Sequence, residues 1–274
     1  MQLFALDETG QLVLAAQALR QKDYICRECQ QAVRVRRGAH KRAHFFHNEP
    51  LRTCSQHGKS LEHLQIQHRI EHALLQQCTL EQRFEEIGRI ADVCWEKEKI
   101  IFEIQCSAIS VREVKKRTSD YERLGYTVIW ILHDHYFGQP SIKAPEEWLH
   151  GRLCFFTNID QEGKGYFYDR CSLIVHGQRR NIGPFLPIEI TEPLPKPALT
   201  GNLPHILRNR IQQTSFCFRG DLFHAPRTLL EEAHRIETRL ERYQWLRKCQ
   251  QVLSRYLLRP YEALMRLMLE KYCG

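Results

Sequence analysis

Two acidic side chains and one amide side chain lie close together on a predicted β-hairpin. Two apolar runs are expected to form its strands, with the charged quartet 96–99 as the turn. If the turn spans that quartet, Trp95 pairs with Ile100, and Asp92 then lies opposite Glu103. Like charges that face each other across a strand pair destabilise it, whereas a divalent cation bound between them reverses that effect. The acid pair therefore predicts a metal site.

Gln105 extends this pattern along the second strand. It follows Glu103 by two residues, so the two side chains share one face. An Asp on one strand and Glu-x-Gln on the next is how a metal-dependent nuclease core presents its ligands. A sheet with one hydrated face explains the same alternation without a metal. Apolar residues 101, 102 and 104 indicate burial around Glu103, which favours the metal site.

A second group of side chains with metal-ligand spacing lies nearer the N-terminus. Cys26-x-x-Cys29 is followed by His44-x-x-His47, and two close pairs at this separation can converge on a tetrahedral Zn²⁺. Its role would be structural, because a segment of fewer than about sixty residues builds little core and a metal replaces the missing burial. A hydrophobic cysteine pair beside surface histidines is the alternative. The spare candidate ligands are His40, Cys54 and His57.

The composition is that of a globular protein with an excess of positive charge. The 274 residues carry a formal net charge of +8, which favours an anionic partner such as nucleic acid, although this is a weak signal by itself. Eleven cysteines without a recognisable signal peptide predict reduced thiols and a cytoplasmic location. No uncharged apolar run is long enough to span a bilayer.

Three parts are expected along the chain. Residues 1–58 predict a small β module that carries the Cys/His group. Residues 59–150 predict the order helix, three strands, helix, strand, which ends in a βαβ unit. Residues 151–274 predict a β-rich segment, a proline-rich linker at 193–204, and a helical region broken at Pro260. The apolar spacing of this last region is too loose to predict a coiled coil.

Helix start and stop signals lie on both sides of the acid pair in the sequence. Ser60 is a candidate cap for a helix that carries Glu62 in its first turn. Ser110 begins a capping box for a second helix, which is expected to stop at Gly125. Residues 126–132 are almost wholly apolar and predict a buried strand. The acids are therefore expected to lie on a sheet between two helices.

Taken in order, these motifs resemble the bacterial competence protein CoiA family. The motifs are Cys26-x-x-Cys29, His44-Phe45-Phe46-His47, Glu62-His63, Arg89-Ile90-Ala91-Asp92-Val93, Glu103-Ile104-Gln105, Arg117-x-x-x-Tyr121 and Ile129-Trp130-Ile131. That family looks like the restriction-endonuclease-like superfamily, the PD-(D/E)xK nucleases. The resemblance implies an α/β fold with a mixed sheet flanked by helices, preceded by the zinc-binding β module and followed by a mainly helical C-terminal extension.

The resemblance also implies roles for single residues. Asp92 would be the motif aspartate, Glu103 the second acid and Glu62 the helix acid. Together they would hold Mg²⁺ or Mn²⁺, which generates hydroxide and neutralises charge on the phosphate. A glutamate in a first helical turn is favoured by the helix dipole in any case, which is the alternative for Glu62. Gln105 stands where lysine is usual, and an amide carries no charge to stabilise phosphate.

The function that these inferences predict is metal-dependent cleavage of DNA, single- or double-stranded, in competence and recombination. Competence or recombination proteins are further expected partners. Lys115, Lys116 and Arg117 are weaker candidates for nucleic-acid contact, because such charges most often form an exposed helix face. The alternative is a catalytically silent DNA-binding or adaptor protein that uses the nuclease fold. Gln105 favours this alternative, and the acid pair disfavours it.

Overall fold

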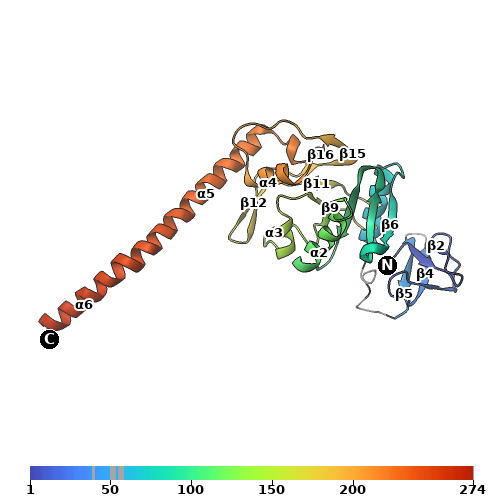
Figure 1. Ribbon diagram of the computed structural model, residues 1–274, viewed down its shortest axis with the longest axis horizontal. Helices are drawn as coiled ribbons and strands as arrows, with labels where there is room; N and C mark the ends of the chain where they lie inside the picture. The colour runs from blue at the N-terminus through green and yellow to red at the C-terminus, as the bar shows by residue number, and fades with distance from the viewer. Residues whose placement is uncertain (39–40, 50–53, 55–58, 274) are drawn as a thin grey trace.

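The protein is divided into a small β module, a central sheet with helices on both faces, and a C-terminal region that ends in a long helix (Figure 1). The computed structural model describes residues 1–38, 41–49, 54 and 59–273. A mixed α/β architecture with an N-terminal β region and a helical C-terminal segment was the fold predicted from the sequence, and it is confirmed.

The N-terminal β module is a five-stranded sheet in the order β2-β1-β3-β4-β5, and every pair in it is antiparallel. Its strands are β1 (Phe4–Leu6), β2 (Leu12–Leu14), β3 (Asp23–Ile25), β4 (Ala32–Gly38) and β5 (Lys41–His47). Its core is small and is built around Tyr24, Val33 and Phe45. Because this core buries little apolar surface, the module would gain stability from a cross-link between its strands and loops.

The central sheet has seven strands in the order β14-β11-β10-β9-β8-β7-β6. Their bounds are β6 (Thr79–Phe84), β7 (Arg89–Trp95), β8 (Ile100–Gln105), β9 (Thr127–His133), β10 (Cys154–Thr157), β11 (Phe167–Asp169) and β14 (Leu186–Pro187). The three middle strands, β8, β9 and β10, are parallel, and the other pairs are antiparallel. Because β10, β11 and β14 belong to this sheet, it extends beyond residue 150, where the sequence suggested that the core ends.

Two helices cover opposite faces of the central sheet. α1 (Leu61–Ala73) packs through Leu64 and Ile70 in the same buried cluster as Phe102. α2 (Val111–Glu122) packs through Val114 and Tyr121 in the cluster on the other face. β8, α2 and β9 form the predicted βαβ unit, with β8 and β9 parallel. Ser60 Oγ and Ser110 Oγ accept backbone hydrogen bonds in the first turns of α1 and α2, so both predicted caps are confirmed.

The hairpin of β7 and β8 has the predicted register. Trp95 pairs with Ile100, and the described pairing continues to Val93 and Phe102, one step short of Asp92 and Glu103. The turn is a short 3-10 helix, Glu96–Glu98, closed by Lys99 in the left-handed region with φ of 54°. Both strands therefore present their acids near the same end of the hairpin.

The C-terminal region adds two small sheets and two short helices. Its remaining elements are α3 (Ala144–Leu149), β12 (Ser172–Val175), β13 (Gln178–Asn181), β15 (Glu189–Pro195), α4 (His205–Gln213) and β16 (Phe216–Arg219). The sequence suggested a proline-rich linker over 193–204, but its first part belongs to β15. Leu194 and Pro195 pair with Cys217 and Phe216 of β16. Proline is tolerated at the edge of a sheet, where its missing N–H removes no ladder bond.

The chain ends in one long helical arm that projects away from the body (Figure 1). It comprises α5 (Arg227–Leu253), a π-helical turn (Ser254–Leu258) and α6 (Arg259–Cys273). The predicted break at Pro260 is wrong. Proline lacks an N–H and crowds the carbonyl of the preceding turn, and here the wider π turn directly before it keeps the helix continuous. Among the described helices, none combines the length and apolar character that a membrane span requires.

Candidate active site and metal centre

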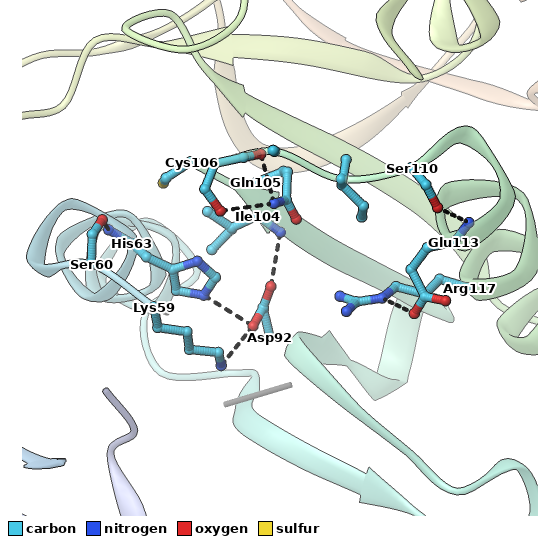
Figure 2. A pocket seen from close by; sticks show the side chains of 13 residues that line it. Lys59, Ser60, His63, Asp92, Ile104, Gln105, Cys106, Ser110, Glu113 and Arg117 are labelled. Carbon is cyan, nitrogen blue, oxygen red and sulfur yellow. Dashed lines mark hydrogen bonds and ion pairs between the residues drawn. The ribbon is translucent and has the colours of Figure 1, made fainter. Parts of the chain in front are cut away.

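A cavity of about 420 Å³ opens where α1, β7, β8 and α2 meet. Asp92 lies at its centre, with Lys59 and His63 on one side and Arg117 on the other (Figure 2). Gln105 lines the same cavity. The structure therefore brings together residues from the segment before α1, from both hairpin strands and from α2.

Asp92 is buried, and hydrogen bonds hold it in place on all sides. Its Oδ1 lies 2.8 Å from Lys59 Nζ and 3.0 Å from His63 Nε2. Its Oδ2 accepts the backbone N–H of Ile104 at 2.9 Å, and Gln67 donates to its backbone carbonyl. Because a carboxylate can only accept, His63 Nε2 carries the hydrogen in this contact. The side chain is thus fixed in one orientation at the cavity.

The local charges keep Asp92 ionised. Burial opposes ionisation, but attraction to His63 and Lys59 and their hydrogen bonds outweigh it and hold the pKa of Asp92 well below its usual range. Burial likewise opposes the charge of Lys59, but Asp92 and Glu81 raise the pKa of this ammonium. Burial lowers the pKa of His63. At neutral pH, where this lowering leaves the imidazole neutral, Lys59 is the cation beside Asp92 and His63 contributes its hydrogen bond; the attraction of a charged His63 adds only at acidic pH.

Glu103 lies deeper than Asp92 and is fully buried on β8. Its Oε2 accepts a hydrogen bond from Arg117 Nη1 at 2.9 Å, whereas its Oε1 is buried without a hydrogen-bond partner among the described residues. Burial raises the pKa of Glu103, Arg117 acts against this rise, and the nearby charge of Asp92 adds to it. Besides Arg117, the Tyr121 hydroxyl is the polar group that stabilises this carboxylate, so a cation would add to a partial compensation.

The third predicted acid is not part of this arrangement. Glu62 is on α1, but its Oε1 accepts a hydrogen bond from Gln161 at 2.7 Å and it does not line the cavity. Glu62, Asp92 and Glu103 are also not close enough to form a three-ligand group. The residues present fit a divalent cation in part: Asp92 and Glu103 offer the hard oxygen ligands that Mg²⁺ and Mn²⁺ prefer, but of these two only Asp92 lines the cavity, and the Tyr121 hydroxyl of α2 lies near the Glu103 carboxylate.

Gln105 and Lys59 differ from what the sequence suggested. Gln105 Nε2 donates to the backbone carbonyl of Ser107 at 2.9 Å, so its amide group is engaged by the loop before α2. Lys59 was not identified as a site residue, although its ammonium is the cation nearest to Asp92. The available signal was its position directly before the helix cap Ser60, which brings it to the same helix end as the Glu62-His63 pair.

The cavity also has features that favour an anion. The cap residues Ser60 and Ser110 both line it, so the N-terminal ends of α1 and α2 are directed toward it. Helix N-termini bind phosphate because their first N–H groups are free and the helix dipole is positive there. Arg117 lines the cavity, whereas Lys115 and Lys116 are exposed outside it. The arrangement can bind a phosphate group beside Asp92, although the Glu113 carboxylate also lines the cavity and pairs with Arg117.

The predicted zinc ligands lie together in part. The ligand atoms of Cys26, Cys29, His47 and Cys54 lie within 4.8 Å of one another. Cys29 Sγ is 3.1 Å from His47 Nε2, and Cys26 Sγ is 3.8 Å from Cys54 Sγ. Three cysteines and one histidine are a donor set that fits a tetrahedral structural Zn²⁺.

His44 is not a member of this group, which corrects the predicted ligand set. His44 and His47 are three residues apart on β5, and side chains at that spacing point to opposite faces of a strand. Cys54, one of the spare candidates, takes the fourth position instead. The other two spare candidates, His40 and His57, lie outside the described residues.

Glu81 connects the β module to the cavity. It is buried on β6, and its carboxylate accepts the backbone N–H groups of Leu3 at 3.2 Å and Phe4 at 3.3 Å. The same carboxylate lies 3.3 Å from Lys59 Nζ, which in turn binds Asp92. The start of the chain and the centre of the cavity are therefore joined by two ion pairs.

Comparison with known proteins gives two matches to family models. Residues 59–164 match the nuclease-like domain of the competence protein CoiA, and residues 11–57 match the N-terminal domain of the competence protein CoiA. The first match contains Asp92, Glu103 and the whole cavity, and the second contains the Cys/His group. No curated protein and no solved structure matches the chain.

Proposed function

The chain belongs to the competence protein CoiA family, and from this premise we propose that it is a metal-dependent nuclease that cleaves DNA during competence and recombination. The observation that carries the proposal is the ionised, fixed carboxylate of Asp92 beside the unused buried acceptor of Glu103. Two acids so close together in a buried position are stabilised most by a divalent cation.

The residues around the acids support the binding of a phosphodiester. The N-termini of α1 and α2 would hold the phosphate oxygens, and Arg117 would add positive charge. Asp92 and Glu103 would hold the cation, and when bound, Mg²⁺ or Mn²⁺ supplies an activated water and neutralises charge on the phosphate. His63, as a neutral donor to Asp92, would fix the orientation of that carboxylate.

Lys59 would supply the positive charge that Gln105 lacks. Its ammonium lies at the cavity 2.8 Å from Asp92, and its side chain is only 8% exposed. A buried cation next to the reacting phosphate stabilises the charge that develops there more strongly than it would in water. In this proposal, the lysine that is usual at the position of Gln105 is replaced by Lys59, which comes from another part of the sequence but lies beside the same aspartate.

One observation favours the second candidate function, a DNA-binding adaptor without catalytic activity. Each buried acid already has a cation from the protein, since Lys59 pairs with Asp92 and Arg117 pairs with Glu103. The site is therefore electrostatically compensated without a metal. Such a site could hold DNA through the helix N-termini and Arg117 alone.

Incubation of labelled single- and double-stranded DNA with the protein, with and without Mg²⁺ or Mn²⁺, separates these functions. Asp92→Asn and Glu103→Gln are expected to lower the cleavage rate by orders of magnitude, because metal catalysis depends on ligand charge. Their DNA affinity, measured by gel shift, should remain. Glu98→Gln is the matched control, since this glutamate lies in the hairpin turn away from the cavity. If the wild type binds DNA but does not cleave it with either metal, the nuclease proposal fails and the adaptor function is supported.

The role of Lys59 can be tested by moving the charge. Lys59→Met should strongly reduce cleavage, and adding Gln105→Lys to that variant should restore part of it, because the second substitution returns an ammonium to the same cavity. Lys97→Met is the control, since Lys97 is exposed in the hairpin turn. Thermal unfolding of each variant separates lost chemistry from lost stability. An Lys59→Met variant that cleaves at the wild-type rate rules out this role.

A further inference from the structure

The long helical arm carries a continuous row of exposed apolar side chains, here called the C-terminal stripe. The stripe consists of Trp245, Leu246, Cys249, Val252, Leu253, Tyr256, Tyr261, Leu264, Met265 and Met268. Within α5 and within α6 its members are separated by one, three or four residues, the spacing that places side chains on one face of a helix. The least exposed of them, Met265, is 39% exposed and the most exposed, Tyr256, is 66% exposed.

The π turn keeps the two halves of the stripe in line. Tyr256 and Tyr261 are five residues apart, and at about 100° per residue of a regular α-helix they would point in clearly different directions. A π turn takes about five residues, as the hydrogen bond from Arg259 N–H to Ser254 C=O records. One extra residue is thereby absorbed, and the apolar face of α5 continues on α6.

The charged residues of the arm lie away from the stripe. Helical spacing places Arg247, Lys248, Arg255, Arg259, Glu262 and Arg266 on the other faces. On α6 the signs alternate along one row, from Arg259 through Glu262 to Arg266. An anionic lipid surface or a nucleic-acid backbone is usually met by a uniformly cationic face. Between Trp245 and Met268 the charged residues behind the apolar face are five basic and one acidic, so an anionic lipid surface is the alternative occupant, which the vesicle test includes.

The body of the same chain does not cover the stripe. The arm projects into solvent (Figure 1), and among the described residues of α5 only Leu230 and Ala233, near its start, are buried. From Trp245 to Met268 the stripe extends over about 36 Å at 1.5 Å per residue. An apolar surface of that length on a soluble protein marks an interaction site.

We propose that the C-terminal stripe is a self-association surface, and that its occupant is the same stripe of a second copy of this chain. A straight, narrow apolar face of this kind fits another long helix. Ten side chains that are about half exposed offer on the order of 800 Å² per helix, which is what each partner of a stable interface buries. The stripe itself contains no charged residue, so contact between two copies along it buries apolar side chains and no charge.

The molecular mass of the full chain in solution, measured by analytical ultracentrifugation over a concentration series, tests this proposal. The wild type is expected to be a dimer at micromolar concentration. Leu253→Arg should weaken the dimer about a hundredfold or more, because it places an unpaired charge in an apolar interface. Gln251→Arg is the matched control: it adds the same side chain two residues away on the other face, and its effect should stay within about threefold.

Several outcomes would overturn the proposal. A wild type that stays monomeric at the highest concentration excludes self-association, and so does a Leu253→Arg variant that dimerises like the wild type. Circular dichroism on each variant checks that the helix is intact. Flotation with phosphatidylcholine and phosphatidylglycerol vesicles is a second test. If the wild type is monomeric and binds vesicles, and Leu253→Arg loses this binding, the stripe is assigned to a lipid surface instead.

Discussion

Asp92 illustrates how a buried carboxylate can remain charged. Its ion pair with Lys59, its hydrogen bond from His63 and the N–H of Ile104 together replace the water that burial removed. A buried ion pair adds little net stability, but removal of one partner leaves an uncompensated charge and costs about 3–5 kcal/mol. Asp92→Asn should therefore lower the free energy of unfolding at neutral pH, but by less than that amount, because Glu81 still pairs with Lys59.

The pH dependence of the difference in unfolding free energy between the wild type and Asp92→Asn gives a sharper prediction. The pKa of Asp92 in the folded protein is lower than the value of about 3.9 expected in the unfolded chain. Its stabilisation is thus fully present above that value and is lost as the pH falls below it. Urea unfolding of the wild type and Asp92→Asn from pH 7 to pH 3 should show their stability difference shrinking below about pH 4. A difference that stays constant over this range contradicts the assignment.

At the level of single residues, the sequence identified the acids but not their partners. Asp92, Glu103 and Gln105 were found because the hairpin register follows from strand periodicity and the turn. Lys59 was missed because its contact depends on how α1 docks against β7. The position of Glu62, bonded to Gln161 from a distant loop, depends on tertiary packing in the same way. Whether these residues bind metal stays a prediction.

Among the elements, β5 decides which residues can complete the zinc site. Because His44 and His47 project to opposite faces, His47 lies with Cys26 and Cys29 and His44 does not, and Cys54 is the fourth candidate ligand. We expect Cys54→Ser to lose most of the bound zinc and to lower the melting temperature, since a structural metal contributes folding free energy. His44→Gln should keep about one zinc per chain. Elemental analysis of both purified variants checks this, and equal zinc loss in the two would contradict the ligand set.

The elements that could be predicted are those specified by local sequence. The β7–β8 hairpin, the helix caps Ser60 and Ser110, and the βαβ unit follow from periodicity and capping residues. The errors occur where distant contacts override local preference. Pro195 was expected in a linker but pairs with β16. Pro260 was expected to break a helix, and no local rule indicated that a π turn would accommodate it.

On the scale of the whole molecule, Glu81 links the β module to the central sheet. Its carboxylate holds Leu3 and Phe4 of the module and Lys59 of the cavity. Because an ion pair and backbone hydrogen bonds join at this residue, the two parts are expected to unfold together.

Calorimetry can test that coupling. Removal of zinc with a chelator should lower the midpoint temperature of the single unfolding transition of the wild type, because the loss of the metal destabilises the β module. In Glu81→Ala the β module should unfold in a transition of its own, at a lower temperature than the rest of the chain. Glu85→Ala is the control, since Glu85 pairs with Arg83 at the exposed end of β6. Two transitions already present in the wild type would show that the parts are independent.

The π turn gives the arm a sensitivity to length that its composition does not reveal. The apolar faces of α5 and α6 stay in phase because one residue more than a regular turn requires is inserted before Pro260. Loss or gain of a single residue at this point would rotate everything beyond it by about 100°, while the amino-acid content would hardly change. Substitutions among similar residues preserve the phase, whereas insertions and deletions do not. In this segment the number of residues therefore carries information as much as their identity.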